Sequence, residues 1–129
     1  MEDLFRNRRR LTTIDAGEIR EYCLAKNDVT EGFPFGPSAL VFKTGGKMFL
    51  LMMVDDVPVS LNLKCDPQKA LELREAYACV LPGYHMNKKH WNTVILEPGL
   101  PPGALEEWID DSYNLVRPKG KGTRRKRRG

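Results

Sequence analysis

The amino-acid sequence predicts an α+β fold, with helices on one face of an antiparallel sheet of about four strands. Three short apolar runs between residues 39 and 64 are separated by turn residues, which is typical of a β-meander. Apolar residues at helical spacing occur before the meander and after it. We therefore expect a two-layer sandwich in the order helix, three strands, helix, strand, helix (α-β-β-β-α-β-α).

The three helices are predicted from their caps and from the spacing of apolar residues. Asp15 has the position of an N-cap for the first helix, which runs to about Lys26. Asp66 followed by Pro67 gives the cap and first turn of the second helix, which continues through Ala78. The third helix follows a segment rich in proline and glycine. Its buried stripe is predicted to contain Leu105, Trp108, Ile109, Ser112 and Val116.

Four strands are predicted, at residues 39–43, 47–54, 59–64 and 92–96. Thr44-Gly45-Gly46 supplies a hairpin turn between the first two, so the meander is antiparallel. The second strand is an apolar run without alternation, which indicates burial on both sides. A central position capped by a loop explains this burial, and so does cover from the C-terminal helix, a ligand or a partner subunit.

Alternation in the third strand divides its side chains between two faces of the sheet. Leu61 and Leu63 are expected to face the helices. Asn62 and Lys64 then face the opposite side, the open face. The same alternation on neighbouring strands adds Lys43, Thr93 and Trp91 to the open face.

The charge is unevenly distributed along the chain. Residues 11–116 hold nine Lys and Arg against fifteen Asp and Glu, whereas residues 117–129 hold eight Lys and Arg and no acid. We therefore predict an acidic domain (12–117) between a flexible basic lead-in (1–11) and a disordered basic tail (118–129). The tail includes Arg124, Arg125, Lys126, Arg127 and Arg128. Such a run suits nucleic acid, an anionic membrane surface or an acidic partner, and it also serves simply to solubilise a protein.

The cysteines favour a reducing compartment. Cys23, Cys65 and Cys79 cannot all pair, and none belongs to a CxxC motif. Free thiols without a secretory leader predict a cytoplasmic protein. The longest apolar run, residues 48–54, is too short to span a bilayer. Cys65 precedes the cap of the second helix, a position that suits either a reactive thiol or a small buried core residue.

Residues 83–91 are predicted to form a loop between the second helix and the fourth strand, and both histidines lie in it. The loop combines lysines, which can hold phosphates, with aromatic rings, which can stack on bases. Alternatively, the rings seal the sheet edge and the lysines are only solvated. His85 and His90 lack an evident third ligand, so we expect no metal site and no cofactor. No catalytic constellation is visible, and we expect that the protein is not an enzyme.

Several longer motifs resemble one known family. They are Phe33-Pro34-Phe35-Gly36, Val41-Phe42-Lys43, Leu61–Pro67 and Pro82–Trp91. In these motifs the sequence resembles the MmcQ/YjbR family of small bacterial proteins, over about residues 13–117. The resemblance implies a frataxin-like (CyaY-like) two-layer fold. It also implies a nucleic-acid partner, because members are usually described as DNA-binding.

The leading hypothesis from the sequence is a nucleic-acid-binding protein, with DNA as the expected partner. The candidate contacts outside the tail are Lys43, Asn62, Lys64, Tyr84, His85, Asn87, Lys88, Lys89, His90 and Trp91. The alternative is a module for a small anionic or planar ligand, bound by His85, Lys88, His90 and Trp91 together with the apolar surface of the second strand. A third hypothesis is an interaction domain that forms a homodimer through the second strand.

Overall fold

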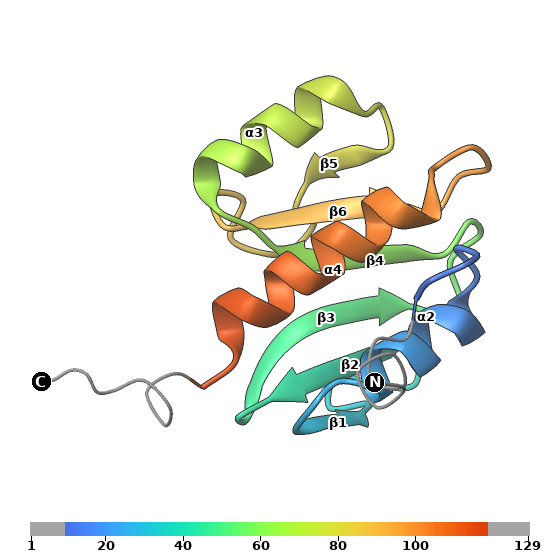
Figure 1. The fold of residues 1–129 in the computed structure, drawn as a ribbon, viewed down its shortest axis with the longest axis vertical. Helices are drawn as coiled ribbons and strands as arrows, with labels where there is room; N and C mark the ends of the chain where they lie inside the picture. Colours follow the sequence, from blue (N-terminus) through green and yellow to red (C-terminus); the bar gives the residue numbers. More distant parts are fainter. Residues whose placement is uncertain (1–9, 119–129) are drawn as a thin grey trace, which may run out of the picture.

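The computed structural model describes residues 10–118, in which three helices pack on one face of a six-stranded antiparallel sheet (Figure 1). The helices are α2 (Ala16–Leu24), α3 (Pro67–Ala76) and α4 (Pro102–Val116). The strands are β1 (Val29–Gly32), β2 (Ala39–Thr44), β3 (Lys47–Met53), β4 (Ser60–Lys64), β5 (Val80–Pro82) and β6 (Trp91–Ile95). Their order across the sheet is β1-β2-β3-β4-β6-β5. The α+β class and the antiparallel sheet are confirmed.

The predicted number of strands is wrong, because the sheet has two further edge strands within the described residues. β1 is half-exposed and has no apolar alternation, so its sequence carries no strand signal. β5 has three residues and ends at Pro82, which an edge strand tolerates. The second helix ends at Ala76, two residues earlier than predicted, because Tyr77 has an extended backbone. The order implied by the family resemblance is therefore only partly matched.

The helix starts follow the local chemistry of the sequence. Asp15 accepts a hydrogen bond from the backbone N–H of Glu18 at 2.8 Å, which caps α2. Asp66 accepts from the N–H groups of Gln68 and Lys69, at 3.1 and 3.2 Å, and so caps α3. Both predicted caps are confirmed.

The main core lies between the helices and the face of the sheet that they cover, called the covered face below. Leu61 and Leu63 of β4 point into it, as the alternation predicted. Ile109 of α4 is fully buried there. Trp108 stacks edge-on against Tyr77, with ring centroids 4.9 Å apart, which joins α4 to the segment after α3.

The side chain of Ser112 pairs with two backbone groups near an irregularity in the pairing of β2 and β3. The register of β2 and β3 shifts at Phe42/Lys43, and both Phe49 and Leu50 belong to the main core. The hydroxyl of Ser112 donates to the Phe49 carbonyl at 2.5 Å and accepts from the Lys64 N–H at 2.9 Å. A buried serine therefore satisfies two backbone groups between β3 and β4.

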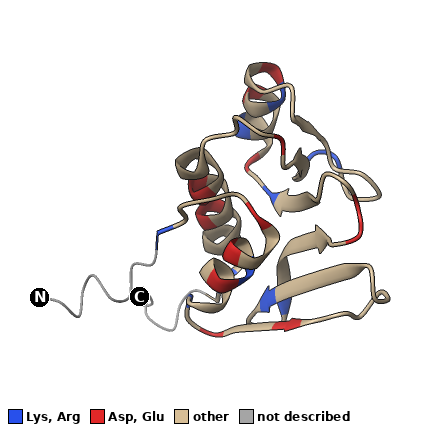
Figure 2. Cartoon of the chain, turned by 90° about the vertical axis from the view of Figure 1, so that its right-hand side faces the viewer, with Lys and Arg blue, Asp and Glu red and all other residues tan. Residues whose placement is uncertain are grey.

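Acidic residues are concentrated on the helical layer, whereas Lys and Arg are dispersed (Figure 2). Lys69 on α3 lies 2.7 Å from both Glu107 and Asp111 of α4. These two hydrogen bonds raise the pKa of the Lys69 ammonium. On the other side of α4, Lys26 lies 2.5 Å from Asp110. The ion pairs tie α4 to its neighbours and neutralise part of its acidic surface.

Candidate functional site

A groove of about 770 Å³ crosses the open face of the sheet, opposite the helices. Most of its floor is apolar and consists of Ala39 of β2, Leu51 and Met53 of β3 and Ile95 of β6. Further apolar lining comes from Phe35, Pro37, Met48, Leu81, Pro82 and Met86. We call this hollow the open-face groove.

The open-face groove explains why β3 lacks alternation in its sequence. Leu50 and Met52 point into the main core, while Leu51 packs with Ala39 and Val41 in a second apolar cluster on the open face. Leu51 is only 7% exposed although no described helix covers it. The predicted burial of this strand on both sides is confirmed.

A short row of polar side chains crosses the floor of the open-face groove. Asn62 of β4 lies opposite Thr93 of β6, and the two side chains are 5% and 6% exposed. The Thr93 hydroxyl donates to Asn62 Oδ1 at 2.5 Å and accepts from the Tyr84 N–H at 2.9 Å. Nearby, the Ser60 hydroxyl donates to Asp56 at 3.3 Å.

The first half of the 83–91 loop forms one wall of the open-face groove. Tyr84, His85 and Met86 all line it. The rings of Tyr84 and His85 lie 4.0 Å apart, and the Tyr84 side chain is exposed. His85 has a φ of 59°, in the left-handed region that residues other than glycine seldom adopt. Strained backbone of this kind is concentrated at functional sites, although Asp28, which does not line the groove, has the same φ of 59°.

The second half of the loop turns away and fastens itself to the end of the sheet. Lys88 donates through Nζ to the Gly83 carbonyl at 3.0 Å, and its own carbonyl accepts from Arg74. Asn87 accepts from the Lys89 N–H at 2.9 Å. The His90 carbonyl accepts from the Cys65 N–H at 2.7 Å. The side chains of Asn87 and Lys88 therefore hold the loop, whereas His90 makes its contact through the backbone.

Glycine is required where the loop leaves β5. A Cβ atom on Gly83 would lie 2.9 Å from both Cβ and the carbonyl oxygen of Trp91. The backbone N–H of Gly83 also donates to that carbonyl at 2.9 Å. Half-buried Trp91 thus packs against the start of the loop, which agrees with its predicted alternative role at the sheet edge.

The remaining predicted contacts lie outside the open-face groove. Lys43 lines a separate hollow with Val41 and Glu31. Lys64 lies opposite Trp91 at the end of β4, and neither lines the groove. Lys89 is exposed and does not line the groove either. The tail arginines and Lys126 lie outside the described residues. Of the ten predicted contacts, the open-face groove brings together Asn62, Tyr84 and His85.

The apolar surface of the second strand was predicted as part of a ligand site, but the individual apolar residues that line the groove were not. Met53 and Leu51 sit in the unalternating run of β3, where counting outward from Leu50 would have assigned them to the open face. Phe35 is 70% exposed at the rim, in the proline-flanked turn before β2. Among the described residues that line the groove none is Lys or Arg, and Asp56 is the acidic one.

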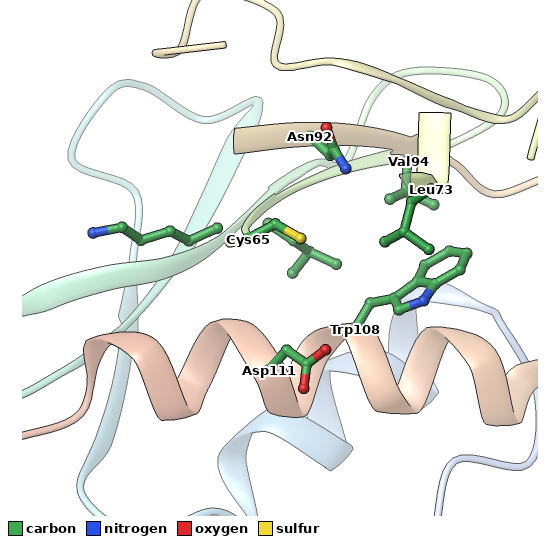
Figure 3. A pocket seen from close by; sticks show the side chains of 8 residues that line it. Cys65, Leu73, Asn92, Val94, Trp108 and Asp111 are labelled. Carbon is green, nitrogen blue, oxygen red and sulfur yellow. The ribbon is translucent and has the colours of Figure 1, made fainter. Parts of the chain in front are cut away.

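Cys65 lines a small cavity of about 10 Å³ beneath α4, where it lies with Leu73, Val94 and Trp108 (Figure 3). Burial is the main cause that raises the pKa of the Cys65 thiol, and this outweighs the nearby lysine. Cys65 is 6% exposed, which favours a small core residue over the reactive thiol considered from the sequence. Cys23 and Cys79 are buried as well.

Two features are absent from residues 10–118. No cluster of three or more His, Cys, Asp or Glu side chains there is arranged to hold a metal ion. In the same residues, none of the helices has the length and apolar character needed to cross a bilayer.

Comparison with known proteins identifies the family. Residues 24–115 match the model of the YjbR family. The chain belongs to the YjbR family. YbdF of Escherichia coli O157:H7 is 48% identical over 85 residues, 65% of this chain and 69% of YbdF. YjbR of Escherichia coli strain K12 is 30% identical over 96 residues, 74% of this chain and 81% of YjbR.

Solved structures share the fold. A crystal structure of a Deinococcus radiodurans protein matches with a TM-score of 0.77 at 39% identity, covering 85% of this chain and 82% of that protein. A crystal structure of a Pseudomonas syringae protein gives a TM-score of 0.71 at 28% identity, covering 81% of this chain and all of the other. The family resemblance recognised in the sequence motifs is confirmed.

Proposed function

We propose that this protein binds a small, planar and largely apolar molecule in the open-face groove. The observation that carries the proposal is a hollow of about 770 Å³ with an apolar floor and a few converging polar groups. Small-molecule sites typically have volumes of about 300–1,000 Å³ and this kind of lining.

Methionine side chains favour a planar ligand. Met48 and Met53 of β3 and Met86 of the loop line the open-face groove, and all three are half-buried. Thioethers adapt their shape and make favourable contacts with aromatic rings. Tyr84 and Phe35, both exposed at the rim, offer further flat surfaces.

The lining favours this function over nucleic-acid binding at the same place. Affinity for nucleic acid comes largely from Lys and Arg contacts with phosphates. None of the described residues lining the groove supplies such a contact. Nucleic-acid binding stays a prediction for the exposed loop residue Lys89 and for the basic tail, which lies outside the described residues.

The four methionines at positions 48, 52, 53 and 86 provide a direct test. With ¹³C-labelled methionine methyl groups, titration with 2-naphthol should shift the NMR signals of Met48, Met53 and Met86. Met52 points into the main core and is 1% exposed, so its signal should stay in place as an internal control. Equal movement of all four signals, or of none, would contradict the proposal.

A matched pair of variants adds a second test. Met53→Lys places a charge on the groove floor and should weaken 2-naphthol binding at least about tenfold, because an ammonium resists the desolvation that an apolar ligand imposes. Leu71→Lys changes an exposed apolar residue of α3 and should leave binding unchanged. Loss of a dimer with Met53→Lys, measured as halved mass in light scattering, would instead identify a second copy as the occupant.

We place this activity in the cytoplasm. The three cysteines are buried and unpaired. Free thiols of this kind are typical of reducing compartments.

A further inference from the structure

We infer that Asn62 is the polar anchor of the open-face groove, and that its ligand is an uncharged planar molecule with a carbonyl oxygen. The inference rests on the proposed function and names the chemical class that the groove takes. It starts from the side-chain amide of Asn62, which is nine-tenths buried at the centre of the floor.

The two ends of the Asn62 amide differ in what they contact. Its Oδ1 accepts a hydrogen bond of 2.5 Å from the Thr93 hydroxyl. Within residues 10–118, the Asn62 side chain makes one hydrogen bond, the one to Thr93. Its Nδ2 therefore has no hydrogen-bond partner among these residues. An amide nitrogen carries two N–H donors, so this end has unused donor capacity.

The free end of Asn62 faces the groove rather than the interior. In the described part of the chain, Thr44 Oγ1 is the one side-chain polar atom that is both sealed from solvent and unpaired. Asn62 Nδ2 therefore keeps some contact with solvent, and the solvent beside Asn62 is in the open-face groove. A ligand that covers this nitrogen without accepting from it would leave a buried donor unpaired, which is costly.

Thr93 fixes the direction of the amide. The Thr93 hydroxyl accepts from the backbone N–H of Tyr84, so its own hydrogen is directed to Asn62 Oδ1. The donor end of Asn62 is then held toward the groove by a chain of bonds that begins in the backbone of the loop. The same chain links the floor of the groove to the wall that carries Tyr84 and His85.

The charges around the groove favour a neutral acceptor. A carboxylate bound at Asn62 would meet no Lys or Arg among the described lining residues, and Asp56 lies on the same lining. Removing an ion from water without a countercharge is strongly unfavourable. A ketone, an amide or a quinone-like carbonyl presents the acceptor without this penalty.

Three probes of one size separate these possibilities: acetophenone, α-methylstyrene and benzoate. The first two differ by a carbonyl oxygen in place of a methylene group, and the third carries a charge. The readouts are the methionine methyl signals, which report occupancy, and the side-chain amide signal of Asn62, assigned in the unmodified protein by triple-resonance NMR. We expect acetophenone to shift both, α-methylstyrene to shift the methyl signals alone, and benzoate to shift neither at equal concentration.

The variant Asn62→Asp keeps an oxygen for Thr93 and removes both N–H donors. The affinity for acetophenone relative to α-methylstyrene should fall about tenfold, the loss expected for one hydrogen bond. Asn114→Asp, at an exposed position of α4, should leave the ratio unchanged. Because the Asn62 amide signal is read in the unmodified protein, a variant that fails to fold does not decide the outcome.

The outcomes distinguish the two proposals. Methyl shifts with both uncharged probes, but an Asn62 amide that responds to neither, would overturn the carbonyl anchor and leave the proposed function in place. Tighter binding of benzoate than acetophenone would overturn the choice of an uncharged ligand. No methyl shift with any probe up to its solubility limit would overturn the proposed function itself.

Discussion

The two faces of the central sheet are formed by the same strands but differ in what covers them. On the covered face, Leu50 and Met52 of β3 are sealed beneath α4 and are at most 1% exposed. On the open face, Leu51 and Ala39 are nearly as buried, yet they border a groove of about 770 Å³. One face is packed against helices, and the other is an apolar floor with room above it.

This difference separates stability from recognition within one strand. A side chain enclosed on all sides contributes both its burial and its packing to the free energy of unfolding. A side chain beside a groove contributes burial, but a ligand can complete its packing. Adjacent residues of β3 therefore serve different purposes, and variants at neighbouring positions can test this.

The largest expected effect comes from Leu50→Ala on the covered face. Truncating a leucine enclosed in a core leaves a cavity and typically costs about 2–5 kcal/mol. Leu51→Ala should cost less, about 1–2 kcal/mol, because the lost volume opens into the existing groove and leaves mainly a transfer contribution. Urea denaturation of the two variants measures both values. Equal losses would show that the two faces of β3 contribute alike to the free energy of unfolding.

Ser112→Ala tests the polar bridge on the covered face. The change orphans the Phe49 carbonyl and the Lys64 N–H, both bonded to the serine hydroxyl. Leaving buried backbone groups unpaired should lower the free energy of unfolding by about 1–3 kcal/mol. Ser38→Ala removes an exposed bond to Asp55 and is the matched control, with an expected change below about 0.5 kcal/mol. A loss as small as that of the control would show that water replaces the serine.

Gly83→Ala perturbs the open face through the loop. The new methyl group would lie 2.9 Å from backbone and side-chain atoms of Trp91, so the loop must move. We expect a loss of about 1–3 kcal/mol in denaturant unfolding and weaker binding of 2-naphthol, because Tyr84 follows directly. Gly103→Ala has open space around its Cβ position and should change neither. Unchanged binding of 2-naphthol by Gly83→Ala would show that the position of the loop does not affect the groove.

Alkaline pH should lower the free energy of unfolding gradually, by a smaller amount, through two groups on the covered face. Burial raises the pKa of the Cys23 thiol to about 12, and burial with a hydrogen bond to Asp110 raises the pKa of Tyr22. Above about pH 9, the unfolded chain loses these protons while the folded chain keeps them. The free energy of unfolding should therefore fall as the pH rises through this range.

Cys23→Ala removes one of the two groups that cause this fall. Denaturant unfolding of the variant between pH 8 and 11 should show a shallower loss of stability with pH than the unmodified protein. An identical pH dependence in both proteins would show that Cys23 does not contribute.

What could be predicted from the sequence depended on the range of the interaction that fixes each feature. The cap at Asp66 with Pro67 behind it is chemistry between neighbours, and it was predicted at the right residue. The facing of Leu61 and Asn62 follows from alternation within one strand and was also predicted. β1 gives no such local signal, because an exposed edge strand is held by its pairing with β2 rather than by its own sequence.

The site was predicted less well, because it depends on distant contacts. Asn62 meets Thr93 across 31 positions of the chain, and no local pattern links them. The loop attracted attention by its composition, but its lysine and asparagine bond to the loop itself. Only the backbone path decides that Tyr84 and His85 turn to the groove while Lys88 turns away.

The placement of the methionines determines how the protein responds to oxidation. An oxidant converts exposed thioethers into polar sulfoxides and leaves enclosed ones intact. Met48, Met53 and Met86 are accessible from the open-face groove, whereas Met52 is shielded beneath α4. Peroxide exposure would therefore make the floor hydrophilic before it damaged the core, so recognition would be lost in a protein that is still folded. Enzymatic reduction of the sulfoxides would restore it.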